Sequence, residues 1–248
     1  MGFTERSTTY RILSDVFDRR ASDISRHRGY RADQCASGVA AITRNTLGFG
    51  CQFLDANLDG HLDLLIVNGH IDDTVRNVRR EATYSQSPHL LLNDGQGKFR
   101  DVAAQLGGPF NTPRVGRGLA IADIDRDGDS DVLITTNGGA PVLLRQDVQN
   151  GNRSIRFRLQ GTKSNRDSIG ATVKLMEGGE TQWRMVHSGS SYLSQSELVL
   201  TFGVGHRDRV SRVVIQWPSG RVDEHKNLAT GRMYLCVEEG TIQPLHSY

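Results

Sequence analysis

Two short acidic segments, each followed by an apolar run, limit how this chain can fold. The first, LDANLDGHLDLLIVNG, covers residues 54–69, and the second, IADIDRDGDSDVLITTNGG, covers residues 121–139. Carboxylates placed this close together repel one another, and they do so beside strands that are apolar enough to be buried. The fold must therefore supply something that offsets the repulsion at both places.

The two acidic segments belong to an internal repeat. An offset of 68 residues places Asp55 on Asp123, and it also places Gly60 on Gly128. Each unit is predicted to be a strand, an acidic loop and a second strand rich in Leu, Ile and Val. The sequence HLLLNDGQGKFRDV, which follows the first unit, has the turn residues of a β-hairpin.

The acidic loops share the pattern D-x-[DN]-x-D-G-x-x-D, which is typical of a calcium site. Oxygens at positions one, three and five converge, and the Gly at position six lets the next carbonyl turn inward. Calcium takes about 6–8 oxygen ligands, and its charge offsets the carboxylate repulsion. We therefore predict two calcium sites. The candidate ligands are Asp55, Asn57, Asp59, His61 and Asp63 in the first loop, and Asp123, Asp125, Asp127, Asp129 and Asp131 in the second.

Two other structures, an EF-hand and a pair of metal-free turns, share part of this acidic pattern. An EF-hand needs a Glu at position twelve and flanking helices, but position twelve is Ile66 or Ile134, in strand-like runs. A pair of metal-free turns, in which Asp side chains cap backbone amides, remains the alternative. Two loops in register, each with an Asp at position nine, favour the metal. We expect the second loop to bind more tightly, because Asp125 replaces the neutral Asn57.

The chain changes character after the polar segment 147–152. Short alternating strands follow, among them SIRFRLQ, LVLTFGVG and RMYLCVEEG, and they predict a β-sandwich or small barrel. We divide the chain into three parts. They are a poorly defined segment at 1–44, which could be the tail of a preceding blade, two repeat units at 45–147, and a C-terminal domain at 151–240.

These motifs resemble two known families. Phe49-Gly50 and the two acidic loops resemble the FG-GAP (VCBS) repeat of integrin α-subunit propellers, although the second unit has Arg117-Gly118 in place of Phe-Gly. The segments NRSIRFRLQGTKSNRDSIGATVKL, SGSSYLSQSELVLTFGVG and VVIQWPSGRV resemble the ASPIC/UnbV domain, which follows such repeats in bacterial relatives of cartilage acidic protein. The resemblance implies an all-β protein with β-propeller blades, loop-bound calcium, an exported location and a poorly defined binding role.

Two repeat units do not make a complete propeller, which closes with about 4–8 blades. We expect this chain to be the C-terminal part of a longer protein, or to complete a ring with another chain. The missing blades would then come from the same full-length chain or from a second one. The ring as given is incomplete, and its sheet edges need cover.

Composition excludes several classes of partner. A net charge of +2 indicates no nucleic-acid partner, and no apolar run reaches the roughly 18 residues of a membrane span. The sequence shows no leader peptide, so an extracellular or periplasmic location is expected only from the resemblance and the calcium loops. Cys35, Cys51 and Cys236 have no C-x-x-C spacing, and their disulfide state stays open.

The predicted function is a non-enzymatic, calcium-stabilised binding or scaffold module whose ligand is a protein or a carbohydrate. The alternative is an exported enzyme or enzyme accessory subunit with its site at the propeller face near His70 or in the Ser-rich tail. No G-x-S-x-G elbow surrounds the serines after His187. The positions of His70 and Asp72 in the folded chain help to distinguish the binding module from the enzyme. Convergence of His70 and Asp72 with a group from the C-terminal domain in a pocket would favour the enzyme, whereas side chains that point to bulk solvent would disfavour it.

Overall fold

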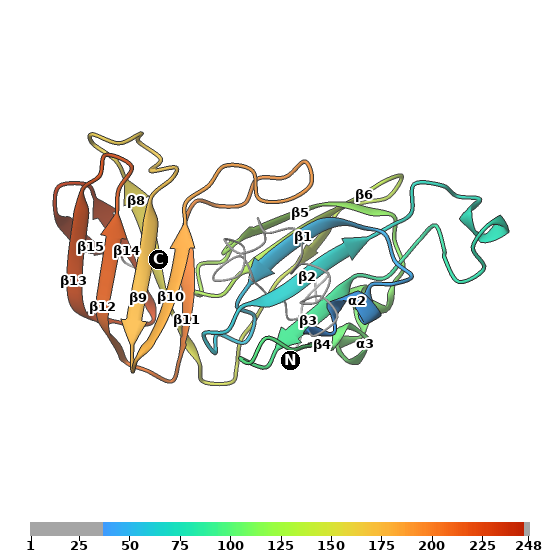
Figure 1. The fold of residues 1–248 in the computed structure, drawn as a ribbon, viewed down its shortest axis with the longest axis horizontal. Coiled ribbons are helices and arrows are strands. Elements are labelled where there is room, and N and C mark those ends of the chain that lie inside the picture. Colours follow the sequence, from blue (N-terminus) through green and yellow to red (C-terminus); the bar gives the residue numbers. More distant parts are fainter. Residues whose placement is uncertain (1–36, 246–248) are drawn as a thin grey trace.

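The structure is a computed structural model that describes residues 37–245 (Figure 1). Most of the segment 1–44, including Cys35, lies outside the described residues. The prediction of an all-β fold is confirmed, because the described part consists of four β-sheets with only short helical turns. These turns are α2 (Val39–Ile42), η1 (Val75–Asn77), α3 (Ala103–Leu106) and η2 (Gly108–Asn111).

The first repeat unit and the hairpin after it form one antiparallel sheet, in the order β1-β2-β3-β4. The Asp94-Gly95 turn joins the last two strands, as the hairpin sequence predicted. The sheet contains β1 (Gly48–Leu54), β2 (Asp63–Asn68), β3 (His89–Asn93) and β4 (Phe99–Asp101).

The second repeat unit forms a three-stranded sheet in the order β5-β6-β7. Its strands are β5 (Gly116–Ala122), β6 (Asp131–Thr136) and β7 (Val142–Leu144). The two units also share their register. Asp131 pairs with the last residue of β5, as Asp63 pairs with the last residue of β1. Each acidic loop is therefore the turn between the first two strands of its sheet.

The two sheets pack face to face around one core, which contains the fully buried Leu65, Leu119 and Leu144. Glycine permits this close approach. A Cβ added to Gly50 would lie 2.6 Å from the Cβ of Leu119, so a larger residue would force the sheets apart. Arg117, which departs from the Phe-Gly pattern, places its guanidinium 4.0 Å from the centre of the Phe49 ring.

The C-terminal half is a sandwich of two four-stranded sheets, in the orders β10-β9-β12-β13 and β11-β8-β14-β15. The β8–β14 pair is parallel, and the other neighbours are antiparallel. Alternating apolar residues from both sheets fill the core, including Phe157, Phe202 and Trp217. The strands are β8 (Arg153–Gln160), β9 (Thr172–Glu177), β10 (Glu180–Met185), β11 (Leu200–Gly205), β12 (Arg209–Gln216), β13 (Val222–Ala229), β14 (Arg232–Val237) and β15 (Thr241–Leu245).

A buried carboxylate fastens the long loop after β8. Oε2 of Glu238 accepts hydrogen bonds from the backbone N–H groups of Thr162, Lys163 and Ser164, at 2.8, 2.8 and 2.7 Å. Its other oxygen accepts the hydroxyl groups of Ser164 and Ser219, at 2.9 and 2.5 Å. These bonds favour the charged form and lower the pKa of Glu238 to about 2 against its partial desolvation.

Candidate metal centre

In the first acidic loop, the carboxylates at both ends are held by backbone N–H groups. Asp55 directly follows β1 and accepts the N–H groups of Asp59 and Gly60, at 3.0 and 2.8 Å. Gly60 adopts a φ of 96°, the left-handed conformation that the Gly at position six was predicted to permit. Asp63 begins β2 without exposed surface and accepts the N–H groups of Ala56 and Asn93, at 3.3 and 2.7 Å.

The other predicted ligands of the first loop bond mainly to one another. Asn57 donates its Nδ2 to Asp59 Oδ2 at 2.7 Å, and Asp59 Oδ1 accepts the N–H of His61 at 2.8 Å. The ring of His61 lies near Gly95 in the neighbouring hairpin, since a Cβ on that glycine would be 2.7 Å from its Nε2. The side chain of His61 therefore packs on the hairpin of the first sheet, and its backbone carbonyl stays the group predicted to serve a metal.

Burial makes the first loop electrostatically costly. Desolvation, with the nearby Asp59 charge, raises the pKa of Asp55 to about 7. Desolvation and the charge of Asp55 raise the pKa of Asp63 to about 8. These groups therefore resist ionisation at neutral pH unless a cation lies between them.

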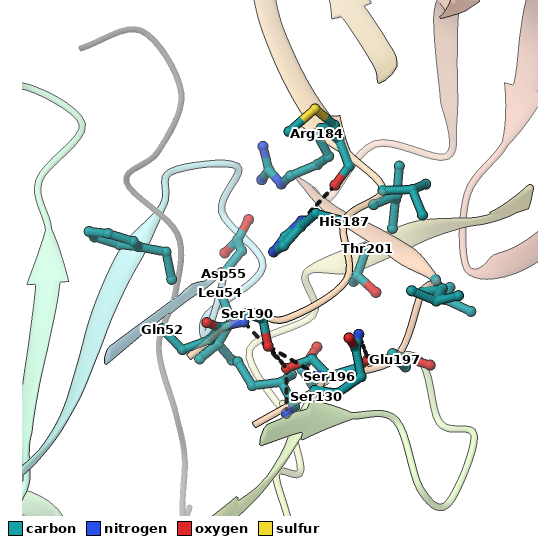
Figure 2. A pocket seen from close by; sticks show the side chains of 18 of the residues that line it. Gln52, Leu54, Asp55, Ser130, Arg184, His187, Ser190, Ser196, Glu197 and Thr201 are labelled. Atoms are coloured by element: carbon teal, nitrogen blue, oxygen red, sulfur yellow. Dashed lines mark hydrogen bonds between the residues drawn. The ribbon is translucent and has the colours of Figure 1, made fainter. Parts of the chain in front are cut away.

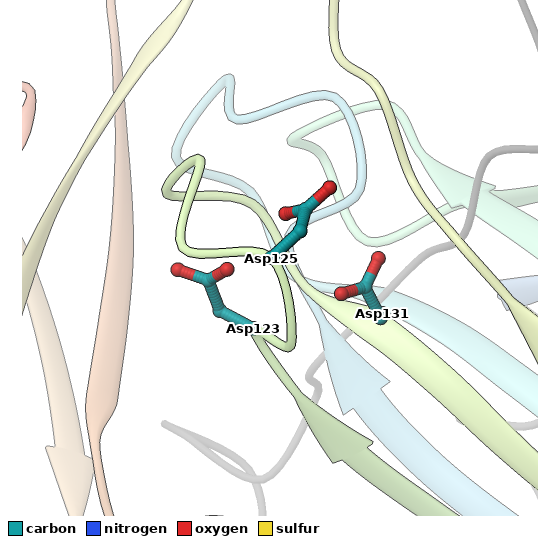
Figure 3. Close-up of side chains that lie close together, drawn as sticks. All are labelled: Asp123, Asp125 and Asp131. Atoms are coloured by element: carbon teal, nitrogen blue, oxygen red, sulfur yellow. The ribbon is translucent and has the colours of Figure 1, made fainter. Parts of the chain in front are cut away.

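The second loop brings three of the predicted ligands together. Asp123, Asp125 and Asp131 each offer a carboxylate oxygen, and these oxygens lie within 4.8 Å of one another (Figure 3). Asp131 accepts the N–H groups of Ile124 and Gln146, at 2.8 and 2.9 Å, which repeats the role of Asp63. Its pKa is raised to about 6, mainly by burial.

A second group in this loop includes a residue that the sequence did not indicate. Asp125, Asp127 and Asp147 also offer oxygens within 4.8 Å of one another. Asp147 follows β7, and its carboxylate is 2.5 Å from Nη2 of Arg145. The acidic pattern ends at Asp131, so only the return of the chain after β7 brings Asp147 to the loop.

The side chain of Asp129, at position seven of the second loop, is buried. Position seven was predicted to turn its carbonyl inward, and the structure shows in addition that the carboxylate of Asp129 accepts the N–H of Val148 at 2.7 Å. Its other oxygen has no hydrogen-bond partner, and burial raises its pKa to about 9. The reason is that Asp129 faces the chain segment that returns after β7.

The second loop fits a hard divalent cation such as calcium. Oδ1 of Asp123 is buried and has no hydrogen-bond partner, while Oδ2 accepts the N–H of Gly128 at 3.2 Å. An oxygen that is desolvated and unpartnered beside other carboxylates is costly unless a cation or proton reaches it. Within residues 37–245, both acidic groups with such convergent oxygens include Asp125 of this loop. In the first loop, Asp55 and Asp63 face backbone N–H groups.

Both loops contact the C-terminal sandwich, which the sequence did not predict. In the first loop, the carbonyl of Leu58 accepts the N–H of Gly205 at 2.9 Å. In the second, the carbonyl of Gly128 accepts the hydroxyl of Ser154 at 2.5 Å. Asp123 also forms an ion pair with Arg156 of β8. The candidate metal loops therefore lie at the junction of the two halves.

The connection between β10 and β11 covers the strand edges beside the loops, and we call residues 189–197 the edge-capping segment. The hydroxyl of Ser191 accepts the N–H of Cys51 at 2.9 Å. The hydroxyls of Ser194 and Ser196 accept the N–H groups of Leu119 and Ile121, both at 3.0 Å. These serines thus act as hydrogen-bond acceptors for edge strands, a role that their sequence did not reveal.

A cavity of about 530 Å³ lies between β1 and this connection (Figure 2). Asp55 faces it from the first loop, and Arg184 and His187 face it from the C-terminal half. The hydroxyl of Ser190 is 2.8 Å from that of Ser196. Nδ1 of His187 lies 3.0 Å from the carbonyl of Met185, so the recorded partner of this ring is a backbone group and not one of the two serines.

His70 and Asp72 form a local turn. Nδ1 of His70 accepts the N–H of Asp72 at 3.0 Å, and Asp72 caps the N–H of Thr74 at 2.8 Å. Asp72 is exposed. The described contacts bring no group of the C-terminal domain to this pair, so the convergence that would favour the enzyme alternative is not seen among the described residues.

Two stretches of the chain match known protein families. Residues 68–134 match the family described as FG-GAP-like repeat, and residues 161–243 match the family described as ASPIC and UnbV. The resemblance predicted from the sequence is confirmed, since both families are matched, in the predicted order along the chain. The repeat match includes the second acidic loop and begins after the first.

Human Cartilage acidic protein 1 is similar to this chain, with 29% identity over 126 residues. The similar region covers 50% of this chain and 19% of the human protein, so the chain spans about a fifth of that relative. The matched families are of repeat and binding type, and neither indicates a catalytic family. In the part of the chain that the structure describes, no helix is long and apolar enough to cross a bilayer.

Cys51 and Cys236 are free thiols in this structure. Desolvation of the sulfur raises the pKa of Cys51 to about 11, although part of this residue is exposed at the surface, and burial raises the pKa of Cys236 to about 12. Both groups are therefore protonated at neutral pH and react slowly.

Proposed function

We propose that this chain is a non-enzymatic, calcium-stabilised binding or scaffold module of an exported protein, acting in an extracellular or periplasmic space. The observation that carries the proposal is the buried, unpartnered Oδ1 of Asp123 beside Asp125 and Asp131. The two families that match the chain support an extracellular type of module.

The ion would be held by the acidic loops. Asp123, Asp125 and Asp131 would bind it in the second loop, with Asp127 at position five. Asp55, Asn57, Asp59 and Asp63 would bind it in the first loop, with the carbonyl of His61. Bound calcium would supply positive charge to buried carboxylates, and so it would stabilise both the strand turns and the junction with the sandwich.

The partner surface that we propose is the outer face of the second sheet. Leu133 and Leu143 are 41% and 45% exposed there, and Ile124 is 56% exposed on the loop. Exposed apolar residues on a sheet face favour cover by another sheet. Further blades, from the same full-length chain or from another chain, would supply it. The ligand of the completed module would be a protein or a carbohydrate.

Thermal unfolding with and without calcium tests this function. A site with a Kd of about 10⁻⁴–10⁻³ M, as in extracellular modules, adds about 1.4–2.7 kcal/mol at about 10 mM calcium. We expect the melting temperature to rise with millimolar calcium and to return with chelator. Calcium should raise the melting temperature of Asp123→Asn by less than that of the unaltered chain. Asp73→Asn changes an exposed acid outside the loops, so calcium should raise its melting temperature as much as that of the unaltered chain. A melting curve indifferent to calcium and chelator would contradict the proposal.

A further inference from the structure

Arg156 is a buried arginine that joins the second acidic loop to the C-terminal domain. It lies on β8, and only 4% of its surface is exposed. Its Nη1 pairs with Oδ2 of Asp123, and its Nη2 donates to Oε1 of Glu197 at 2.7 Å. Its Nε donates to the hydroxyl of Thr201 at 3.1 Å. Three acceptors from different segments therefore fix the guanidinium.

The same contacts close a ring of hydrogen bonds around Asp123. The backbone N–H of Asp123 donates to Oε1 of Glu197 at 3.2 Å, and Glu197 is also the acceptor for Arg156. Glu197 ends the edge-capping segment, and its own N–H donates to the carbonyl of Ile121 at 2.9 Å. The position of the Asp123 carboxylate is therefore set by two segments of the C-terminal half.

The two oxygens of Asp123 have different surroundings. Oδ2 accepts from Arg156 and from the N–H of Gly128. Oδ1 is buried without a partner, and the carboxylates of Asp125 and Asp131 are its neighbours. Arg156 therefore leaves one oxygen free for a cation and holds the other in place.

The first loop is built differently at this position. Both oxygens of Asp55 accept N–H groups of their own loop, from Asp59 and Gly60. Asp123, by contrast, accepts the N–H of Gly128 and the guanidinium of Arg156. The first loop therefore orients its position-one carboxylate with its own backbone, whereas Asp123 takes one of its two partners from β8.

Arg156 could act on a calcium ion in two opposite ways. Its positive charge repels a cation nearby, whereas its hydrogen bond orients a ligand, and loss of such an orienting partner costs about 10–100-fold in metal affinity. Glu197 lies against the guanidinium and offsets its charge. With the repulsion reduced in this way, orientation is the larger effect.

We propose that Arg156 is a positioning residue for a calcium site in the second loop, with Glu197 as its counter-charge. The inference rests on the proposed function. It adds that calcium binding in the second loop and docking of the C-terminal domain stabilise each other, because the same carboxylate takes part in both.

The test is a calcium titration of the full chain by calorimetry, with Asp59→Ala to remove the first site. Arg156→Met should weaken the remaining site by about 10–100-fold. Glu197→Gln should also weaken it, by about tenfold, because it leaves the guanidinium charge uncompensated. Arg212→Met is the matched control. Arg212 is half-exposed and pairs with Glu224 on the sandwich, with no contact to either acidic loop among its recorded pairs, so its removal should leave the affinity unchanged.

A second readout separates docking from binding. Calcium should slow proteolysis of the polar linker 147–152 in the unaltered chain, and it should do so much less in Arg156→Met. If Arg156→Met fails to fold, Arg156→Lys keeps the charge but cannot bridge Asp123 and Glu197 at once, so it should weaken the site as well.

The outcomes are distinguishable. Calcium binding by the intact chain, with an unchanged second site in both the Met and Lys variants, overturns this inference and leaves the proposed function standing. An intact chain that binds no calcium at either loop overturns both.

Discussion

Replacing Asp63 by Asn removes one buried negative charge from the first loop, and the sign of its effect on stability should depend on calcium. Asp63 has no exposed surface, and its two oxygens accept the N–H groups of Ala56 and Asn93. Burial and the charge of Asp55 raise its pKa from 3.8 to about 8. In the absence of a cation, this carboxyl therefore opposes folding at neutral pH.

Two effects set the magnitude for Asp63→Asn in chelator. A pKa raised by about four units corresponds to about 5 kcal/mol at pH 7.5, since one unit equals 1.36 kcal/mol. Asn offers one acceptor oxygen instead of two, so one N–H group loses its partner at a cost of about 1–3 kcal/mol. We expect Asp63→Asn to be more stable than the unaltered chain by about 2–4 kcal/mol.

The stability difference between Asp63→Asn and the unaltered chain should also depend on pH. Because the pKa of Asp63 is raised in the folded state, the folded chain holds a proton that the unfolded chain releases above pH 3.8. The unaltered chain therefore loses stability from this group as the pH rises from 3.8 to about 8. The advantage of Asp63→Asn should be smallest near pH 4 and should grow up to pH 8.

Calcium should reverse or reduce the advantage, because Asp63 is a proposed ligand of the first loop. Urea unfolding in chelator and in about 10 mM calcium measures both states, and the unaltered chain should gain more from calcium than the variant by about 1.4–2.7 kcal/mol. Asp94→Asn is the control. Asp94 is exposed, and hydrogen bonds from Gln96 and Lys98 lower its pKa, so its removal should not stabilise. If Asp63→Asn is less stable than the unaltered chain in chelator at pH 7.5, then the buried carboxylate of Asp63 does not oppose folding and the reasoning is wrong.

Three further predictions concern other parts of the fold. Glu238→Gln should lower the free energy of unfolding by about 2–4 kcal/mol, as measured by urea unfolding. Glu239 is an exposed neighbour and provides the control, since Glu239→Gln should change this free energy by less than about 0.5 kcal/mol. Because the pKa of Glu238 is lowered, its contribution is present above pH 4.5 and should disappear as the pH falls toward 2. Ser196→Ala leaves an edge N–H without its acceptor and should cost about 1–3 kcal/mol, with self-association by sedimentation as a second readout. Asp127→Ala should remove the tighter calcium site and Asp59→Ala the weaker one; the reverse order in titrations would show that ligand charge does not set the affinity.

The strands and turns could be predicted because their causes are local. The alternation of Ile155, Phe157 and Leu159 marks a strand with one buried face, and β8 has that structure. The Gly at position six of each loop was predicted from the backbone conformation it permits, and Gly128 has a φ of 101°. Such features depend on a few neighbouring residues, so a single sequence reveals them.

The contacts around the second loop could not be predicted, because they join distant residues. Arg156 and Glu197 meet Asp123 only after the sandwich has folded and docked. The serines of the edge-capping segment gave a weak signal, since the spacing of Ser194 and Ser196 matches the two-residue repeat of a strand edge. That spacing has meaning only once it is known which strand edge lies opposite.

The acidic loops form the turns of the two repeat sheets, and they also join these sheets to the C-terminal sandwich. A Cβ on Gly203 of β11 would lie 2.0 Å from Oδ2 of Asp55, so the sandwich packs directly on the first loop. The hydroxyl of Ser154 and the guanidinium of Arg156 hold the second loop in the same manner. Any cation that neutralises these carboxylates acts on residues that also join the two halves. A chain that needed only tight turns could use Asn and Gly without crowding charge, but a junction held by buried carboxylates can respond to any cation that neutralises them. This is the physical reason to place the charge clusters at the junction and not elsewhere on the blades.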